Sequence, residues 1–235
     1  MSDSLIIIPT YNEKENIEKI IRKILSLEKL FHILVIEDGS PDGTAKIVKD
    51  LQKEFKDSLF IEERSGKLGL GTAYIHGFKW ALKKDYKYIF EMDADFSHQP
   101  KYLPAFLEAI QHNDIVLGCR YMTDGGVEGW AAHRQWLSVL GNLYAKGLLN
   151  MKLRDMTGGF KCFRRSALEV LPLKEIRSTG YIFQVEVTHL AHLIGLSICE
   201  VPIVFLEREQ GVSKMSWNIC WEAMVGMWRL RKRSV

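Results

Sequence analysis

The sequence predicts an α/β fold built on a mostly parallel sheet with helices on both faces. Short apolar runs alternate along the chain with segments whose apolar residues recur at helical spacing. The apolar runs are continuous, which is typical of strands buried on both faces. Polar clusters follow several of these runs directly, at the place where open α/β sheets bind their ligands.

The composition limits the classes of function. The chain has 235 residues, of which 47% are hydrophobic, enough for a sizeable core and too many for a disordered chain. The formal net charge of +3 creates no overall field that would predict a nucleic-acid partner. The four cysteines form no CxxC pair, so they predict neither a zinc site nor a disulfide framework, and they fit a reducing cytosol.

The first half of the chain alternates strands with helices. The predicted strands lie within 4–13, 32–43, 59–64, 86–95 and 114–121. The predicted helices lie within 16–27, 44–55, 67–84 and 101–111, the third of them entered from a glycine-rich loop. This order favours βαβ units and therefore parallel strands.

After about Tyr121 the alternation stops. The predicted elements are a loop and a long apolar helix within 125–149, a turn-rich segment at 154–168, a helix at 181–195 and a last strand within 197–205. The apolar residues expected to pack the long helix on the domain, or alternatively to form a groove for a lipid tail, are Trp136, Leu137, Leu140 and Leu143. No repeat or low-complexity linker interrupts the chain, so we expect one domain.

The tail and the N-terminus bear on membrane contact. No run of about 18 apolar residues is present, so no helix is expected to span a membrane. The first residues lack a basic segment and do not resemble a signal peptide. The tail from Lys214 contains WNICWEAMVGMWRLRKR, with three tryptophans and a basic end. It predicts an amphipathic helix at a membrane surface, with packing on the domain as the alternative.

A predicted core strand ends in Asp93 and Asp95. In an extended strand they would face the same side, roughly 6–7 Å apart. Two carboxylates so placed repel each other unless a cation lies between them. Mg²⁺ or Mn²⁺ bound to phosphate oxygens would remove the repulsion, although a solvated strand end or a helix cap is the alternative for an isolated DxD pattern.

Two further clusters lie at strand ends. In EDGSPDGT, Asp38 follows a strand directly and is placed to accept hydrogen bonds from a base or sugar, whereas Asp42 and Thr44 favour a helix cap. In RSGKLGLGTA, glycines precede a helix, as in loops that approach phosphates closely. That loop matches neither GxGxxG nor a Walker loop, so it is a weak signal alone.

Seven motifs together resemble one family. They are PTYNE at 9–13, EDGSPDGT at 37–44, KLGLGTAY at 67–74, DADFSHQP at 93–100, GCRY at 118–121, TGGFKCF at 157–163 and REQGVSKMS at 208–216. In this order and spacing the sequence closely resembles the polyprenol-phosphate (dolichol-phosphate) mannosyltransferases of glycosyltransferase family 2. The resemblance covers about 210 residues.

The resemblance implies a GT-A fold in one domain, 1–235. Within it, 1–121 would bind the sugar nucleotide, 122–213 would bind the acceptor, and 214–235 would form the C-terminal helix. It also implies an inverting transfer of a hexose, usually mannose from GDP-mannose, to a polyprenyl monophosphate, with Mg²⁺ or Mn²⁺ as cofactor. Such an enzyme would be cytoplasmic and peripheral at the cytoplasmic face of a membrane.

The resemblance also implies site residues by position. The sugar nucleotide would be bound by Pro9, Tyr11, Glu13, Ile36, Asp38, Lys67, Asp93, Ala94, Asp95, Arg120, Arg208 and Lys214. The acceptor phosphate would be bound by Arg120, Arg134 and Ser213, and the catalytic set would be Asp95, Arg120 and Arg134. The metal would be bound by Asp93 and Asp95, with Ser97, His98 or water in the place that some relatives give to glutamine.

Two positions depart from the family pattern. Glu37 stands where an aspartate is usual, one methylene longer, and we expect this to be tolerated because Asp38 is the contacting residue. Ser97 stands where some relatives have the metal-binding glutamine, so the third metal ligand stays open.

The chemistry of the acceptor narrows the mechanism. A phosphate monoester is already anionic near neutral pH, since its second pKa is about 6, so we expect no dedicated general base. The alternatives are UDP-glucose or another sugar nucleotide as donor, or a saccharide acceptor in the synthesis of cell-surface polysaccharides. A third alternative, of another class, is an inactive membrane subunit that binds sugar nucleotides. The motifs fix neither the sugar, nor the prenyl chain length, nor the oligomeric state.

Overall fold

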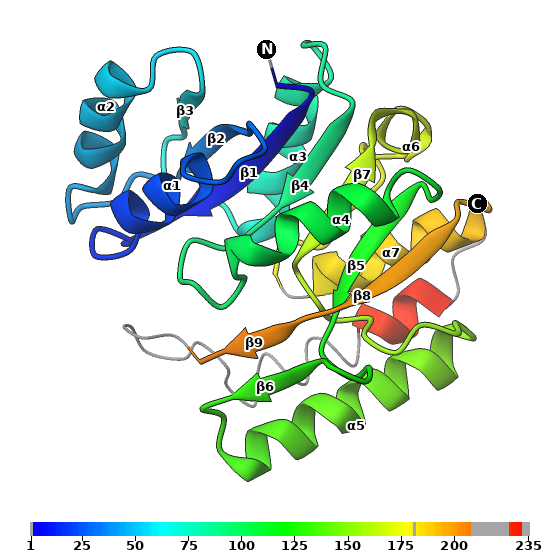
Figure 1. The fold of residues 1–235 in the computed structure, drawn as a ribbon. Helices are drawn as coiled ribbons and strands as arrows, with labels where there is room; N and C mark the ends of the chain where they lie inside the picture. The colour runs from blue at the N-terminus through cyan, green and yellow to red at the C-terminus, as the bar shows by residue number, and fades with distance from the viewer. Residues whose placement is uncertain (1, 181, 208–225, 232–235) are drawn as a thin grey trace.

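The computed structural model describes residues 2–180, 182–207 and 226–231. Within these residues a seven-stranded sheet has the strand order β3-β2-β1-β4-β7-β5-β8 (Figure 1). The strands are β1 Ser4–Thr10, β2 His32–Glu37, β3 Leu59–Glu63, β4 Tyr88–Glu91, β5 Ile115–Cys119, β7 Lys161–Arg164 and β8 Ile198–Pro202. All neighbouring pairs are parallel except the two that involve β7. The predicted mostly parallel sheet is therefore confirmed.

The helices cover both faces of this sheet. They are α1 Ile17–Leu25, α2 Thr44–Glu54, α3 Leu70–Ala81, α4 Leu103–Ala109, α5 Ala132–Leu149, α6 Arg165–Val170 and α7 Ile182–Leu193, with a short 3₁₀ turn at Pro100–Tyr102 before α4. Successive residues of β1 point to opposite faces, so Ile7 packs towards α3 and α7 while Ile6 packs towards α1, α2 and α4. The apolar runs thus fill two cores, one on each side of the sheet.

α1 shows how the sequence pattern produces this packing. Ile17, Ile20, Ile21 and Ile24 are all fully buried, at the i, i+3, i+4, i+7 spacing of one helix face. The opposite face carries Arg22, which is exposed and paired with Glu18 and Glu54. The helix therefore forms because one stripe of isoleucines can be buried against β1 and β2.

β7 was not predicted. It lies inside the segment expected to be turns, and it pairs antiparallel with β4 on one side and β5 on the other. The strand is short and its first residue, Lys161, is a charged side chain with only 1% exposure. A short segment with one lysine and two arginines is typical of the protein surface. Here the pairing with β4 and β5 outweighs that local sequence pattern.

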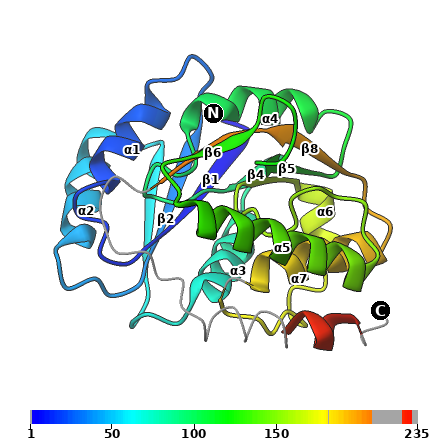
Figure 2. The same cartoon turned by 90° about the horizontal axis from the view of Figure 1, so that it is seen from below.

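A smaller layer lies below the main sheet in Figure 1. β6 Gly126–Glu128 pairs in parallel with β9 Val204–Leu206, and α5 runs beneath them (Figures 1 and 2). The predicted last strand within 197–205 is therefore divided between β8 and β9. Residues of α5, α7 and 226–231 share a third core cluster, which includes Ala145, Val185 and Leu230. The described part of the C-terminal tail thus packs on the domain.

The apolar residues of α5 do not all pack as the sequence suggested. Trp136, Leu140 and Leu143 are 69%, 57% and 59% exposed, so the prediction that they pack on the domain is wrong. The side chains of α5 that are buried instead are Asn142, Ala145 and Leu149. Because 136, 140 and 143 follow the spacing i, i+4, i+7, they form one apolar stripe along the outside of the helix.

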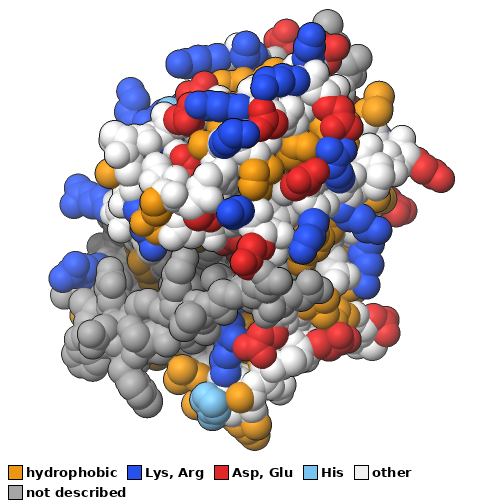
Figure 3. All heavy atoms as spheres, turned by 90° about the vertical axis from the view of Figure 1, so that its left-hand side faces the viewer, with side chains coloured by type: hydrophobic (Ala, Val, Ile, Leu, Met, Phe, Trp, Pro, Cys, Tyr) orange, Lys and Arg blue, Asp and Glu red, His pale blue; other side chains and the backbone are white. Residues whose placement is uncertain are grey.

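The face seen in Figure 3 carries basic and acidic side chains side by side. Exposed ion pairs occur within α2, such as Lys46 with Asp50, and between α2 and β3, such as Lys49 with Glu63. Exposed pairs of this kind contribute little to stability. A surface of mixed charge also produces no field of one sign. In the part of the chain that the structure describes, no helix has the length and apolar character needed to cross a membrane.

Candidate functional site

A cleft opens at the carboxyl ends of β1, β2 and β4. Because the three strands are parallel, their ends meet at one edge of the sheet. The cleft has a volume of about 190 Å³ and is closed on one side by the start of α3 at Gly69 and Leu70. Of the residues expected to bind a sugar nucleotide, those that line it are Pro9, Tyr11, Glu13, Asp38, Lys67, Asp93, Ala94 and Asp95.

The other expected residues lie elsewhere in the structure or outside its described part. Ile36 is fully buried in the core behind the cleft, where its backbone is paired with β1, so its side chain does not line the site. Arg208, Ser213 and Lys214 lie outside the described residues. Arg120 and Arg134, which the sequence also assigned to the phosphates, belong to a second cluster beside the cleft.

Asp93 and Asp95 lie in the turn after β4. The strand ends at Glu91, earlier than the sequence suggested, so the expectation that both aspartates stand on the strand is wrong. The carboxylate of Asp95 accepts hydrogen bonds from the backbone N–H of Ser97 at 3.1 Å and from its hydroxyl at 2.5 Å, which tightens the turn. Phe96 takes a left-handed conformation within it, with φ of 61°. Both carboxylates still reach the cleft.

His98 stabilises this turn through a hydrogen bond to its backbone. Its Nδ1 accepts a hydrogen bond from the backbone N–H of Asp93 at 3.0 Å, and its ring stacks on Phe160 with the centres 5.0 Å apart. The side chain is 2% exposed. Burial lowers the pKa of His98, which favours the neutral imidazole. Because the Nδ1 lone pair is occupied, that nitrogen is not available to a metal ion.

Asp93 is the more accessible of the two carboxylates. Its side chain is 31% exposed, and it accepts a hydrogen bond of 3.3 Å from the hydroxyl of Tyr74, a fully buried residue of α3. Tyr74 in turn stacks on Phe183 of α7. The pKa of Tyr74 is raised by burial and by the neighbouring carboxylates, so it acts as a hydrogen-bond donor here.

A charged pair lies behind Asp93 in the core. Glu91 at the end of β4 and Lys161 on β7 are both essentially inaccessible, with Lys161 Nζ 3.8 Å from a carboxylate oxygen of Glu91. Burial raises the pKa of Glu91 to about 7 and lowers that of Lys161 to about 8. Gln184 of α7 also accepts a hydrogen bond from Lys161. No sequence pattern predicts this pair, because Glu91 and Lys161 come together only through the pairing of β4 with β7.

Asp38 and Glu37 have different tasks at the end of β2. Both carboxylate oxygens of Asp38 accept hydrogen bonds of 2.6 Å from Arg64, and both side chains are 8% exposed. The sequence did not predict a role for Arg64, because an arginine after a strand is usually exposed and its partner Asp38 is 26 residues away. The buried carboxylate of Glu37 accepts backbone N–H groups of Gly39 and Ser40 at 2.9 and 2.8 Å. Glu37 therefore shapes the loop and does not enter the cleft.

The second cluster gathers around Trp130. The guanidinium carbons of Arg120 and Arg134 lie 5.6 and 4.1 Å from the centre of the same Trp130 ring. Arg134, on α5, also pairs with Glu207 at 2.9 Å. Phe205 of β9 contacts Trp130, Arg120 and His98, so it connects this cluster with the Asp93 turn. The guanidinium groups of Arg120 and Arg134 are thereby held on one indole ring, which Phe205 connects to the turn that carries Asp93.

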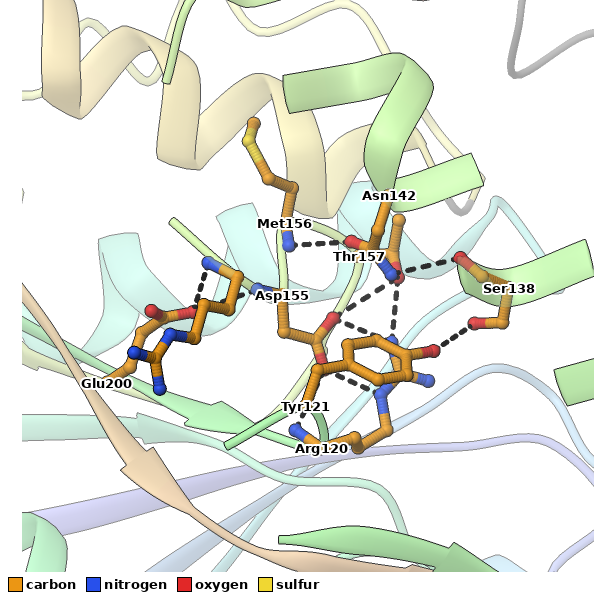
Figure 4. A network of polar contacts seen from close by, with 9 residues as sticks. Arg120, Tyr121, Ser138, Asn142, Asp155, Met156, Thr157 and Glu200 are labelled. Carbon is orange, nitrogen blue, oxygen red and sulfur yellow. Dashed lines mark hydrogen bonds and ion pairs between the residues drawn. The ribbon is translucent and has the colours of Figure 1, made fainter. Parts of the chain in front are cut away.

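Arg120 is fixed by a network that Figure 4 shows. Asp155 accepts hydrogen bonds from its Nε at 2.6 Å and its NH2 at 2.7 Å, and Thr157 accepts another from NH2 at 2.7 Å. Glu200 of β8 accepts the backbone N–H groups of Arg154 and Asp155, each at 2.8 Å. Burial alone would raise the pKa of Asp155, but the ion pair with Arg120 overcomes this and leaves that pKa below its ordinary value. Asp155 is therefore an ionised anchor for Arg120.

The donor set fits a hard divalent cation. Two carboxylates and the nearby Ser97 oxygen are the ligand types that Mg²⁺ and Mn²⁺ prefer. The described residues contain no group of three or more His, Cys, Asp or Glu arranged to hold a metal ion. A cation held by Asp93 and Asp95 would thus take further ligands from water and from a bound diphosphate, as Mg²⁺ usually does.

Comparison with known proteins identifies the family of the chain. The family model for glycosyl transferase family 2 matches residues 5–171. The chain is 42% identical over 233 residues to a polyprenol monophosphomannose synthase of Mycolicibacterium smegmatis, covering 98% of this chain and 88% of that protein. It is 41% identical over 225 residues to an undecaprenyl-phosphate mannosyltransferase of Micrococcus luteus, covering 96% and 92%.

Two solved structures share the fold at low identity. A glucosyl-3-phosphoglycerate synthase of Mycobacterium tuberculosis, solved with Mn²⁺ and UDP, superposes with a TM-score of 0.68 at 15% identity, covering 99% of this chain and 79% of that one. A mannosyltransferase of Pyrobaculum calidifontis, solved with GDP-Man and Mn²⁺, gives 0.64 at 15% identity, covering 97% and 69%. The GT-A fold expected from the motifs is confirmed.

Proposed function

The chain belongs to glycosyl transferase family 2, and from this premise we propose that it transfers mannose from GDP-mannose to a polyprenyl phosphate. The two relatives of 42% and 41% identity are named as a polyprenol monophosphomannose synthase and an undecaprenyl-phosphate mannosyltransferase, which supports mannose and a polyprenyl phosphate. The observation that carries the proposal is the pair of arginines on Trp130, held beside the nucleotide cleft by Phe205. Two guanidinium groups at this place suit a phosphate acceptor, because arginine binds phosphate through paired hydrogen bonds.

The geometry supports a single displacement with inversion. A phosphate oxygen of the acceptor would attack C1 of the mannose and form the new C–O bond. The bond from C1 to the diphosphate breaks, and its electron pair leaves with GDP. No proton has to be removed, since the attacking phosphate is already ionised near pH 7. The α-linked donor would therefore give a β-linked product.

In the part of the chain that the structure describes, the carboxylates beside the two arginines are already engaged, which favours a phosphate over a sugar hydroxyl as acceptor. A saccharide acceptor needs a carboxylate that is free to take a proton. Beside the two arginines, Asp155 has both oxygens engaged by Arg120, and Glu207 is paired with Arg134. Neither carboxylate is placed to remove a proton.

We also propose that Asp93 and Asp95 hold Mg²⁺ or Mn²⁺ against the donor diphosphate. When bound, the cation would neutralise the charge that develops on the leaving group. Lys67, whose ammonium lies 4.6 Å from the centre of the Tyr11 ring at the cleft, would add positive charge on the donor side. The fixed position of these groups, more than any proton transfer, would accelerate the reaction.

The test is a turnover assay with radiolabelled GDP-mannose and a short-chain polyprenyl phosphate in the presence of Mn²⁺ or Mg²⁺. We expect a lipid-linked product whose anomeric NMR signal is that of the β-mannoside, and complete loss of turnover in excess EDTA. Arg134→Ala is expected to lower turnover strongly. A retained α-linkage would contradict the displacement, and normal turnover of Arg134→Ala would contradict the role of Arg134. Parallel reactions with UDP-glucose test the alternative donor.

We propose further that the protein works as a peripheral protein at the cytoplasmic face of a membrane. The acceptor is a lipid, and the exposed stripe of Trp136, Leu140 and Leu143 on α5 gives an apolar surface near the arginines. Flotation with anionic liposomes tests this. The double variant Trp136→Ser, Leu140→Ser should float less than the wild type, whereas Leu30→Ser, at an equally exposed leucine before β2, should float normally. Unchanged flotation of the double variant would remove the proposal.

A further inference from the structure

Among the buried residues of α5, Asn142 is the polar one. Asn142 is 5% exposed, and the other buried residues of the helix are Ala145 and Leu149. A buried amide costs free energy unless its donor and acceptor are both satisfied. In Asn142 they are. Oδ1 accepts the backbone N–H of Met156 at 2.8 Å, and Nδ2 donates to Thr157 Oγ1 at 3.2 Å and to the backbone oxygen of Ser138 at 3.1 Å.

The same amide group is linked to Arg120. Thr157 Oγ1, which accepts from Asn142, also accepts from Arg120 NH2 at 2.7 Å (Figure 4). A second contact lies one turn earlier on α5, where the hydroxyl of Tyr121 donates to Ser138 Oγ at 2.7 Å. The inner face of α5 is therefore joined to the end of β5, which carries Arg120 and Tyr121, through hydrogen bonds of fixed geometry.

Arg134 is carried by the same helix. It lies eight residues before Asn142, which corresponds to roughly 12 Å along the helix axis. Arg120 directly follows β5, whereas Arg134 lies on α5. Any rotation or translation of α5 would therefore move Arg134 relative to Arg120. An apolar face alone tolerates small shifts, whereas an amide with both ends bonded selects one register.

Resting on the proposed function, we propose that Asn142 is a positioning residue for the acceptor phosphate. It holds α5 in the register that places Arg134 on the Trp130 ring, beside Arg120. Asn142 does not touch the phosphate itself. Its contribution is to keep two guanidinium groups from different elements at one separation, so that both can bind the same anion.

The test is a double-mutant cycle between Asn142→Leu and Arg134→Ala. Leucine has a similar volume and can pack among the buried apolar residues of α5, but it cannot make the hydrogen bonds of the Asn142 amide. We expect Asn142→Leu to lower kcat/KM for a short-chain polyprenyl phosphate by roughly tenfold to hundredfold, with KM for GDP-mannose unchanged. In the Arg134→Ala background the same substitution should have almost no further effect, because its target is already gone.

Thr188→Val is the matched control. Thr188 is a buried polar residue of another helix, α7, where it donates to the backbone oxygen of Gln184 at 2.8 Å. It should lower the melting temperature to a similar extent and leave kcat/KM for the acceptor close to that of the wild type. An equal fold-loss from Asn142→Leu in both backgrounds, or a loss that Thr188→Val reproduces, would overturn the inference.

A second readout separates this inference from the proposed function. The four proteins of the cycle are the wild type, the two single variants and the double variant. Each is titrated with inorganic phosphate by calorimetry. Weaker phosphate binding by Asn142→Leu only when Arg134 is present supports the inference, and equal binding overturns it. A wild-type chain that binds phosphate but turns over no polyprenyl phosphate would instead contradict the proposed function alone.

Discussion

The backbone N–H of Asp93 donates a hydrogen bond of 3.0 Å to Nδ1 of His98. This contact decides between two roles for the histidine that follows the DAD sequence. A metal-binding imidazole would need a free nitrogen lone pair directed at the carboxylates, whereas here Nδ1 holds the peptide between Met92 and Asp93 in place. His98 thus supports the carboxylate turn as a structural partner.

The first prediction concerns this support. His98→Ala should raise the concentration of Mn²⁺ needed for half-maximal turnover by about tenfold, as is typical when a partner that orients a metal-binding carboxylate is lost. The measurement is turnover against Mn²⁺ concentration. His112→Ala, at an exposed position after α4, is the control and should behave as the wild type. An unchanged metal requirement in His98→Ala would refute the supporting role.

The second prediction concerns Arg64. Removing it leaves the Asp38 carboxylate without its partner in a place that is mostly closed to water, which costs about 3 kcal/mol in the free energy of unfolding. Arg64→Ala should also raise KM for the sugar nucleotide, because Asp38 lines the cleft. Urea unfolding and initial-rate kinetics measure the two effects. Arg22→Ala, which breaks exposed ion pairs, should change neither, and equal behaviour of both variants would refute the prediction.

The third prediction is a pH dependence. The pKa of Asp155 is lower in the folded protein than its ordinary value of 3.8, mainly because the ion pair with Arg120 outweighs burial. The unfolded chain therefore binds this proton more readily than the folded chain does. The stabilising contribution of the carboxylate is complete above about pH 4 and is lost as the pH falls through the folded pKa.

Asp155→Asn should remove that contribution. The variant should be less stable than the wild type by roughly 3 kcal/mol at pH 6, and the difference should shrink as the pH falls below 4. Urea unfolding of both proteins between pH 2.5 and pH 7 measures this. A stability difference that stays constant with pH would show that Asp155 is not an ionised partner of Arg120.

The fourth prediction concerns the contact between α3 and the segment before α7. A Cβ at Gly71 would lie 2.5 Å from the backbone oxygen of Ser178 and 2.7 Å from the ring of Phe183. Gly71→Ala should therefore destabilise the protein by about 1–3 kcal/mol, as other overpacked sites do. Gly66→Ala is the control, because Gly66 lies in the loop before α3 and a Cβ there would meet no atom within 4 Å. Equal melting temperatures of Gly71→Ala and Gly66→Ala in thermal unfolding would contradict the prediction.

Part of this architecture is visible in the sequence, and part is not. The strands that end in Thr10 and Glu37 and the helix α1 follow from apolar runs and helical spacing, because local pattern and burial agree there. The residues of the cleft were found through motifs, since these motifs lie at the ends of strands or in the segments that follow them. Asp38 and Asp95 are of this kind.

Other parts depend on contacts between distant segments. Lys161 reads as a surface residue, but β4 and β5 enclose it. Arg64 and Asp155 carry no local signal, because each is defined by a partner 26 or 35 residues away. The exposed stripe on α5 has the same helical spacing as a buried one, and only the observed packing tells the two apart.

The position of β7 has a consequence for the order in which the chain can fold. Residues 161–164 fill the gap between β4 and β5, although both of those strands are complete by Cys119. During synthesis each of them presents an unpaired edge until Arg164 has left the ribosome. A fragment that stops near residue 121 would keep those edges open and would be prone to aggregate. Residues 1–121 alone are therefore not expected to fold as an independent unit.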